Sequence, residues 1–435
     1  MRASFLEGGL EVVAGARTTM KVGSYFPKLN LFELMLFLYI NSVVINLMAG
    51  FVLGEGRAVS LITSGINAIV ALYVAVLIIK EHMRFDVVVL IGTIGFFLLL
   101  AVAINPQLTS LAIDAVRRFL KCFCGYYLFA RLIENGSLKR ILPYCVLLML
   151  PYCFLVLTSN SINHTDNTEY FPISYSIIIQ VSLLFLFGAR KISFLVVGLA
   201  GAVVVLFAGA RGALVCIAVS VLMYIAYSLK TSRFVYKFFM IALLVGIVAF
   251  LIANLNQLLG FLYDILPTSR TLSYFTKSEI AIDNSRQLIY HNIIYALQND
   301  PFAYRGLLSD RIVGGDVFAV GLGAGTYAHN FILEVLYQNG VVLGSVILIG
   351  IAVAIIKAFH LAARKAPDGE AIKVLIVLFS CSIIQLLYSN SYLICYPFWC
   401  LIGYIVNVFL VYGSPIATRS SKPKPISGKL RTDVR

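Results

Sequence analysis

Charged residues are scarce in this chain. Only 12% of its 435 residues are Asp, Glu, Lys or Arg, whereas 60% are apolar and the mean hydropathy is +0.92. Soluble globular domains carry about 25% charged residues. The shortage of charge excludes an ordinary soluble enzyme and indicates that lipid solvates most of the chain.

Motifs for metals and nucleotides are also missing. The sequence has no Cys-x-x-Cys pair and no histidines at zinc-ligand spacing, so we interpret the eight cysteines as small buried apolar residues. It has neither a Walker A motif nor an Asp-x-Asp motif, and we expect no metal and no cofactor. Residues 1–28 lack an apolar core, so we expect no cleavable signal peptide and expect the first membrane helix to direct insertion.

Long apolar runs are what the sequence has in abundance. A helix that crosses a bilayer needs about 20 mostly apolar residues. Such runs predict an all-α polytopic membrane protein. Counting the runs that are long enough gives about 12 transmembrane helices. The predicted spans are 31–53, 58–79, 86–104, 108–130, 141–159, 173–188, 192–209, 212–229, 234–256, 329–356, 371–390 and 393–412.

The excess of basic residues follows the predicted topology. Of 34 Lys and Arg residues, 24 fall in the N-terminal segment, the even-numbered connections and the tail, seven fall in the odd-numbered connections, and three lie within the fourth span. The positive-inside rule then places both termini in the cytoplasm. We therefore interpret the formal charge of +14 as a topology signal and expect no nucleic-acid partner.

One long connection divides the chain. Residues 1–256 carry the first nine predicted helices, 257–328 form a large external loop, 329–412 carry three more helices, and 413–435 form a basic cytoplasmic tail. Within the loop, residues 285–298 have helical periodicity and predict an amphipathic helix that lies along the membrane surface or caps a cavity. Long ordered loops on a scaffold often carry function.

Three features of the external side are candidates for chemistry. Arg211 stands between two predicted membrane helices, Arg286 opens the predicted loop helix, and His329 precedes Asn330 at the start of the tenth span. A guanidinium in such a place is costly unless it is paired or serves a ligand. Structural alternatives stay open: Arg211 as an interfacial anchor, Arg286 as a solvated helix residue, and His329 as a polar residue at a helix start.

These elements resemble the O-antigen polymerase and O-antigen ligase superfamily. The matching elements are Ala-Gly-Ala-Arg-Gly around Arg211, Ser285-Arg286 running into Asp300-Pro301-Phe302 and Gly306, and Tyr327-Ala328-His329-Asn330-Phe331-Ile332-Leu333-Glu334 before Gly340. The spacing from Asn330 to Gly340 is the most specific part of the resemblance.

The resemblance implies a GT-C-like glycosyltransferase of the bacterial inner membrane with its active site on the periplasmic side. Such an enzyme transfers an oligosaccharide from undecaprenyl diphosphate to an acceptor hydroxyl, with inversion and without a metal. The product is O-antigen or a capsular or exopolysaccharide. The implied partners are the lipid-linked donor, the glycan acceptor, membrane lipids and a chain-length regulator.

The resemblance also implies roles for individual residues. Arg211 and Arg286 are the expected diphosphate ligands, because a guanidinium binds two phosphate oxygens at once. His329 is the expected catalytic base, because an imidazole titrates near neutral pH. Asn330, Glu334 and Tyr327 are the expected substrate-binding residues, with Glu334 equally well explained as a buried polar residue satisfied by a neighbour.

Alternative functions differ in the acceptor or in the class of activity. The run after Tyr327 is more similar to polymerases, which join lipid-linked repeats, than to ligases, which transfer the glycan to the lipid A core. A flippase for lipid-linked sugars is a less favoured third reading, since no internal repeat is present. Arg117, Arg118 and Lys121, the three cations within the fourth span, stay open between lipid headgroup contact and handling of the lipid diphosphate.

Overall fold

The fold consists of helices and the short connections between them. The computed structural model describes residues 27–54, 56–81, 84–132, 138–158, 170–188, 191–208, 210–231, 284–311, 328–366, 369–388 and 390–413. Every regular element in these ranges is a helix. The elements are α1 (Leu31–Leu53), α2 (Arg57–Lys80), α3 (Phe85–Ile104), η2 (Pro106–Leu108), α4 (Thr109–Phe129), α6 (Leu138–Thr158), α7 (Tyr170–Gly188), α8 (Ile192–Ala208), α9 (Arg211–Thr231), α13 (Asn284–Asn299), α15 (Phe331–Lys365), α16 (Glu370–Phe379), the π-helix η4 (Ser380–Ile384), α17 (Gln385–Tyr388) and α18 (Tyr396–Gly413).

Eight helical segments among the described residues are long and apolar enough to cross a membrane. Two further helices, α7 and α8, contain shorter apolar stretches at Ile173–Gly188 and Ile192–Leu206. The predicted span 234–256 lies outside the described residues. A polytopic membrane protein is therefore confirmed at the level of several spans, and the number twelve and the GT-C-like fold stay predictions.

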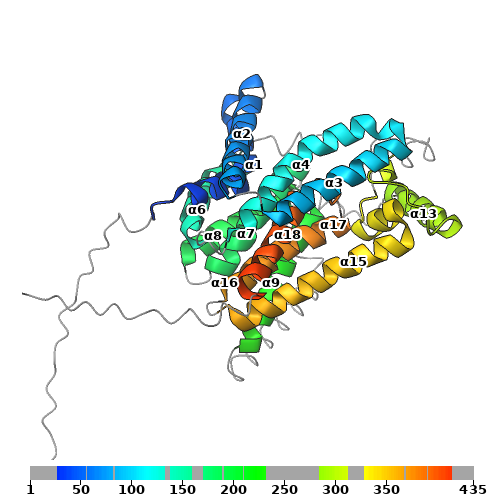
Figure 1. The fold of residues 1–435 in the computed structure, drawn as a ribbon. Coiled ribbons are helices and arrows are strands. Elements are labelled where there is room, and N and C mark those ends of the chain that lie inside the picture. The colour runs from blue at the N-terminus through cyan, green and yellow to red at the C-terminus, as the bar shows by residue number, and fades with distance from the viewer. Residues whose placement is uncertain are drawn as a thin grey trace, which may run out of the picture.

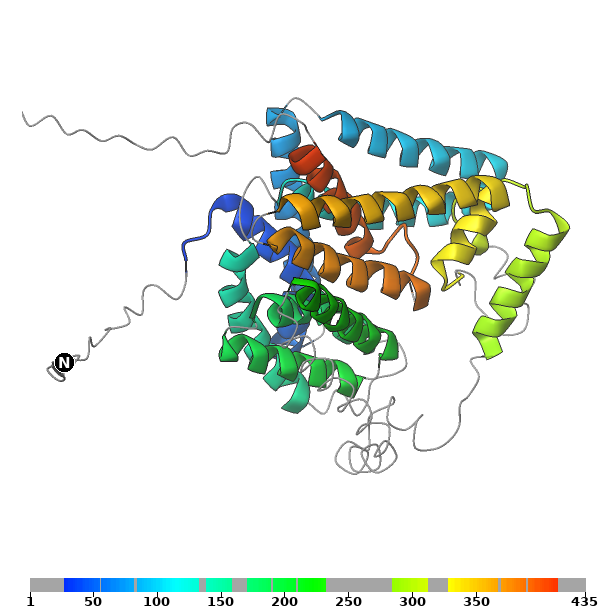
Figure 2. The same ribbon diagram turned by 90° about the horizontal axis from the view of Figure 1, so that it is seen from below.

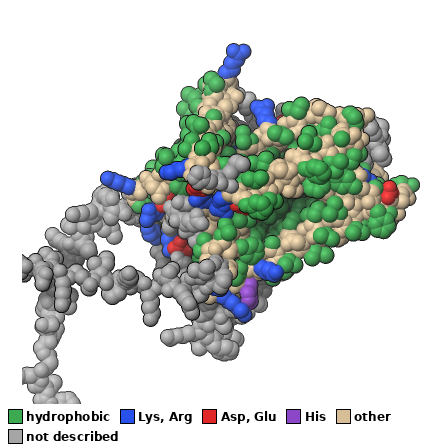
Figure 3. Space-filling model, viewed as in Figure 1, with side chains coloured by type: hydrophobic (Ala, Val, Ile, Leu, Met, Phe, Trp, Pro, Cys, Tyr) green, Lys and Arg blue, Asp and Glu red, His purple; other side chains and the backbone are tan. Residues whose placement is uncertain are grey.

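Apolar side chains cover the outside of the bundle. Figure 3 shows them spread over the helices, and single residues are largely exposed, such as Leu61 at 71% and Leu99 at 74%. Contiguous apolar surface of this kind is unfavourable in water and suited to lipid. All eight cysteines are buried and carry free thiols, which confirms their interpretation as small apolar residues.

The helices run back and forth between two ends of an elongated bundle (Figures 1 and 2). Helix α13 lies at one end, beside the first turns of α15, and coincides with the predicted loop helix. Ion pairs join neighbouring helices at the opposite end: Arg131 with Glu81, Lys139 with Glu370, and Arg140 with Glu33. Arg131, Lys139 and Arg140, which the topology prediction assigns to one side, thus lie at one end, and the membrane side that they face stays a prediction.

Glycines allow α4 and α18 to approach closely in the centre of the bundle. A Cβ added at Gly403 in α18 would lie 2.1 Å from the carbonyl oxygen of Tyr126 in α4. A Cβ added at Gly125 in α4 would lie 2.8 Å from the Cys400 sulfur and nearer still to the Tyr39 hydroxyl. Small residues at such crossings are typical of packing between membrane helices.

The substitution Gly403→Ala tests this packing. The added methyl collides with backbone, which cannot rotate away, so we expect the free energy of unfolding to fall by about 1–3 kcal/mol. Gly350→Ala is the control, because no atom lies within 4 Å of a Cβ added there. Thermal unfolding of the two variants in detergent measures the difference, and equal midpoints would contradict the close approach.

Candidate functional site

Helix α15 is broken at Gly340. This residue has φ 73° and ψ 164°, whereas the residues on either side are helical. Such angles are open almost exclusively to glycine. A Cβ at Gly340 would also lie 3.0 Å from the Phe302 carbonyl oxygen. The predicted single span is therefore two helical segments, with the break ten positions after Asn330.

A short loop that follows α13 satisfies the backbone at this break. The Arg305 and Gly306 amides each donate to the Gln338 carbonyl at 3.0 Å, and the Val341 amide donates to the Pro301 carbonyl at 2.7 Å. Unsatisfied backbone groups are costly where water is excluded. The loop of residues 301–306 therefore completes the interrupted helix and fixes where α13 lies.

The Arg305 side chain ties the same elements together. Its Nη2 donates to the carbonyls of Ala296 and Asp300 at the end of α13, at 3.0 and 2.7 Å. Its guanidinium also lies 4.9 Å from the ring centre of Tyr337 in α15. A cation at a helix C-terminus is stabilised by the helix dipole. Arg305, one of the predicted external arginines, thus has a structural role.

A group of buried side chains lies beside the break, and we name it the polar cluster. Its members are Asp310, Glu334, Gln338, Ser391 and Tyr392. The Gln338 Nε2 donates to Asp310 at 2.7 Å and to Glu334 at 3.5 Å, and its Oε1 accepts from the Tyr392 hydroxyl at 2.6 Å. Glu334 further accepts from the Ser391 hydroxyl at 2.5 Å and from the Tyr392 amide at 3.4 Å. The contacts of Glu334 are thus those of a buried polar residue satisfied by its neighbours.

Electrostatics keep the Tyr392 hydroxyl in its donating form. Burial raises the pKa of the Tyr392 phenol well above its usual value, and the neighbouring carboxyl groups of Glu334 and Asp310 raise it further. Arg311 acts in the opposite direction. A phenol with a raised pKa remains protonated at neutral pH. Tyr392 therefore donates to Gln338 throughout the physiological pH range.

His329 lies where these elements meet. It is half-buried, has a left-handed backbone with φ 51°, and immediately precedes α15. The Asn330 side chain caps α15 by accepting from the amides of Ile332 and Leu333 at 3.0 and 3.2 Å. On the other side of His329, the Ala328 amide donates to Asp310. The backbone around His329 is therefore held from both sides.

Helix α13 approaches His329 directly. The Tyr290 hydroxyl donates to the His329 carbonyl at 3.5 Å. Ile289 and Ile293 on α13 are buried against Ala328 and α15. Arg286 is one helical turn before Tyr290. Because residues three and four apart lie on one face of a helix, Arg286, Ile289, Tyr290 and Ile293 form one stripe along α13 by position. The side chain of Arg286 lies outside the described part of the structure.

The structure describes the remaining predicted site residues, Arg211 and Tyr327, only in part or not at all. Arg211 is the first residue of α9, and its side chain is not among those described. The next residue, Gly212, lies close to the Tyr175 hydroxyl and the Tyr388 Cβ, which places the start of α9 beside the end of α17. Tyr327 lies outside the described residues.

An apolar groove begins at this site. It encloses about 480 Å³ between α15 and the run from α16 to α17. Its lining starts at Phe331 and Ile332, directly after the His329-Asn330 pair, and continues to Ile355 and Ile356 in the second segment of α15. Within the second segment the lining runs from Leu348 to Ile356, or about 12 Å of helix at 1.5 Å per residue. The groove suits part of a hydrocarbon chain.

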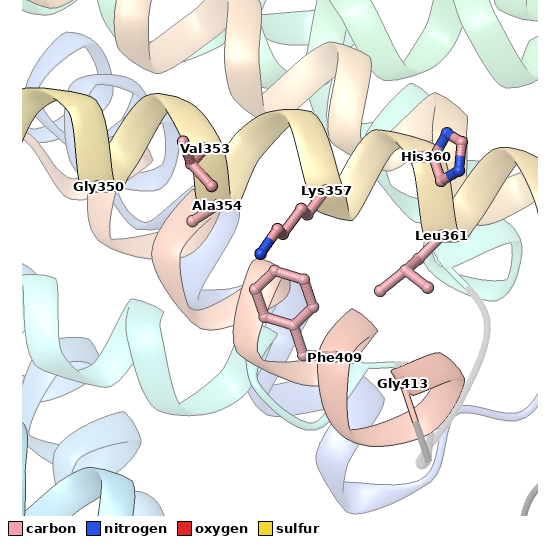
Figure 4. A pocket seen from close by; sticks show the side chains of 8 residues that line it. All are labelled: Gly350, Val353, Ala354, Lys357, His360, Leu361, Phe409 and Gly413. Carbon is pink, nitrogen blue, oxygen red and sulfur yellow. The ribbon is translucent and has the colours of Figure 1, made fainter. Parts of the chain in front are cut away.

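A second cavity lies at the opposite end of α15. It encloses about 580 Å³ between α15 and α18 and is lined mainly by apolar residues. Figure 4 shows Lys357 reaching toward Phe409, while His360 points to the other side of α15. None of the described residues that line this cavity carries a carboxyl group, and Lys357 and His360 are its charged or titratable side chains. We therefore place the candidate site at the α13 end.

Four residues of the polar cluster escape sequence reasoning. Asp310, Gln338 and the Ser391-Tyr392 pair come from three separate segments, and no spacing links them. The one available signal is the position of Gln338, four residues after Glu334 and hence on the same helical face. Over the described ranges, no three His, Cys, Asp or Glu side chains are grouped so as to hold a metal ion.

Comparisons with known proteins identify no relative. No protein-family profile, no curated protein and no solved structure matches this chain. The site must therefore be interpreted from its own residues.

The substitution Gly340→Ala tests the break in α15. Alanine is strained at φ 73° and its methyl meets the Phe302 carbonyl, so we expect a loss of about 1–3 kcal/mol in unfolding free energy. Amide hydrogen exchange at Val341 should accelerate as its bond to Pro301 weakens. Gly350→Ala, on the same helix, is the matched control. Unchanged exchange at Val341 in Gly340→Ala would refute the break.

The substitution Tyr392→Phe tests the polar cluster. It removes the hydroxyl that donates to Gln338 and leaves a buried amide oxygen without that donor, at a cost of about 1–3 kcal/mol. Tyr295→Phe is the control, because Tyr295 is 60% exposed on α13. Thermal unfolding of both variants is the measurement. Equal stability of the two would show that the Tyr392 hydroxyl contributes nothing.

Proposed function

We propose that this protein is a metal-independent glycosyltransferase that polymerises oligosaccharide repeats carried on a lipid diphosphate. The observation that carries the proposal is the apolar groove that starts directly after His329 and Asn330. A polyprenyl chain in this groove would bring its diphosphate headgroup to the α13 end. There, His329 and the Arg286 stripe of α13 lie together, joined through Tyr290.

The chemistry follows from this arrangement. The imidazole of His329 removes the proton from an acceptor hydroxyl as its oxygen attacks the anomeric carbon of the donor. The bond between that carbon and the diphosphate oxygen breaks, with inversion, and the lipid diphosphate leaves. Negative charge develops on the leaving group, and Arg211 and Arg286 are suited to stabilise it because guanidinium groups are always charged.

The setting of the reaction belongs to the same proposal. Basic residues gather at the end opposite α13, and such residues favour the cytoplasm. The α13 end would then face the periplasm of a bacterial inner membrane, with both termini in the cytoplasm. Undecaprenyl diphosphate is the expected carrier, and a chain-length regulator is an expected partner.

Two other activities fit parts of the same site. A ligase would use the same donor and the same residues and would transfer the glycan to a lipid A core. A flippase would bind the donor and move it without breaking a bond. The acceptor and the fate of the sugar phosphate bond separate these three activities.

Variants of the site residues test the enzyme reading. We expect His329→Ala to lower the rate of glycan transfer by about 10²-fold or more, the usual contribution of a general base. Arg286→Gln should lower it by about 10²- to 10³-fold through lost stabilisation of the leaving group.

The assay uses purified full-length protein with a defined undecaprenyl-diphosphate oligosaccharide, and each acceptor is offered in turn. His291→Ala and Arg57→Gln are controls, because both residues are exposed and His291, five residues after Arg286, lies on a largely different face of α13. Extension of the lipid-linked repeat identifies a polymerase, and transfer to lipid A core identifies a ligase. Full activity of His329→Ala and Arg286→Gln with either acceptor would refute the proposed site.

A further inference from the structure

Helix α4 contains three cations, Arg117, Arg118 and Lys121, and they differ in their partners. Arg118 forms an ion pair with Asp114 one turn earlier, with 2.8 Å between Nε and Oδ2, and its side chain is 59% exposed. Arg117 and Lys121 form no ion pair with any residue in the described ranges. These two residues are four positions apart and hence lie on one face of α4.

Both residues line a cavity between α1, α2 and α4. It encloses about 300 Å³, and the two polar side chains that face the cations from α2 are Ser64 and Asn67. The rest of its lining is Tyr39, Ala68, Val70, Ala71, Leu120 and Cys124. The cavity thus offers two positive charges, the neutral polar side chains of Ser64, Asn67 and Tyr39, and no acid among the described residues that line it.

Lys121 is held in place without its charge being neutralised. Its Nζ lies 5.3 Å from the ring centre of Tyr396, and its carbonyl accepts from the Tyr39 hydroxyl. A cation over an aromatic face is oriented by the ring. Asp114, the nearest acid in sequence, pairs with Arg118, and Asp86 on α3 pairs with Arg84 and Tyr126.

Partial burial makes this charge costly. Lys121 is half-buried near the middle of α4, twelve residues from its start and eight from its end. Helix α4 itself is not among the described helices that are apolar enough to cross a membrane. A cation removed from water without a carboxylate partner is unfavourable. Leu120 and Arg117, which line the cavity, are exposed, so the cavity is accessible from the outside of the bundle. An anion that enters from the lipid side would offset the cost.

We propose that this cavity binds the phosphate headgroup of a membrane lipid. Arg117 and Lys121 bind the phosphate oxygens, and Asn67 and Ser64 donate further hydrogen bonds. About 300 Å³ is at the small end of ligand pockets, which suits a compact headgroup. The apolar surface around the opening favours a lipid over free phosphate from water. The proposal rests on the cavity alone and is independent of the proposed glycosyl transfer.

Lipid binding to the purified full-length protein in detergent tests the proposal. The probes are fluorescent phosphatidic acid, fluorescent phosphatidylcholine and inorganic pyrophosphate. We expect Arg117→Gln combined with Lys121→Gln to weaken binding of phosphatidic acid at least about tenfold, the effect of losing charge-assisted hydrogen bonds. Arg118→Gln is the matched control and should change the affinity less than about twofold, as an exposed pair contributes little.

Two further variants separate binding from folding. Arg117→Lys combined with Lys121→Arg keeps both charges and should restore most of the affinity. Asn67→Leu leaves the charges in place and should weaken binding about fivefold, the effect of one hydrogen bond.

Three outcomes would overturn the proposal. The first is equal affinity of the charge-free variant and Arg118→Gln for phosphatidic acid. The second is equally tight binding of phosphatidylcholine. The third is displacement of the labelled phosphatidic acid by micromolar inorganic pyrophosphate, which would assign the cavity to a free anion. None of these outcomes bears on glycan transfer, whose assay uses other residues.

Discussion

The structure around α15 depends on hydrogen-bond partners for the backbone amides and carbonyls at Gly340. A break in a helix frees carbonyl and amide groups, and in an apolar surrounding these groups must find partners. The partners come from the loop after α13, which contacts both sides of the break through Gln338 and Val341. The position of α13 follows from this requirement, and the position of His329 between α13 and the capped start of α15 follows in turn.

The side chains of the polar cluster meet the same requirement, because buried polar groups need hydrogen-bond partners. Gln338 supplies the carbonyl that the loop amides need and a side chain that joins Asp310 to Glu334. Ser391 and Tyr392 then connect these groups to the segment before α18. Buried polar groups are costly when partly satisfied and rigid when fully satisfied. A rigid junction beside a half-buried imidazole is a suitable support for a site that must hold its geometry.

Sequence patterns predict the helices well and the site only in part. Each predicted span except 234–256 overlaps a described helix, because twenty apolar residues in lipid have few alternatives to a helix. The break at Gly340 is not predictable, since Gly344 and Gly350 in the same run stay helical. The π-helical turn at Ser380–Ile384 is not predictable either, since no proline or glycine marks its position in the run. The cluster around Gln338 requires segments that meet only in the folded chain.

The basic residues show why a residue type alone does not identify a site. Arg305 and Arg286 both belong to the long segment predicted to be external, yet the guanidinium of Arg305 is occupied by carbonyls at the end of α13. Arg118 and Lys121 both belong to α4, yet among the described residues only Arg118 has a carboxylate as its partner. A cation with a protein partner stabilises the fold, whereas a cation at depth without one requires an anion from elsewhere. The partners of each charge, which a sequence does not contain, decide between structure and binding.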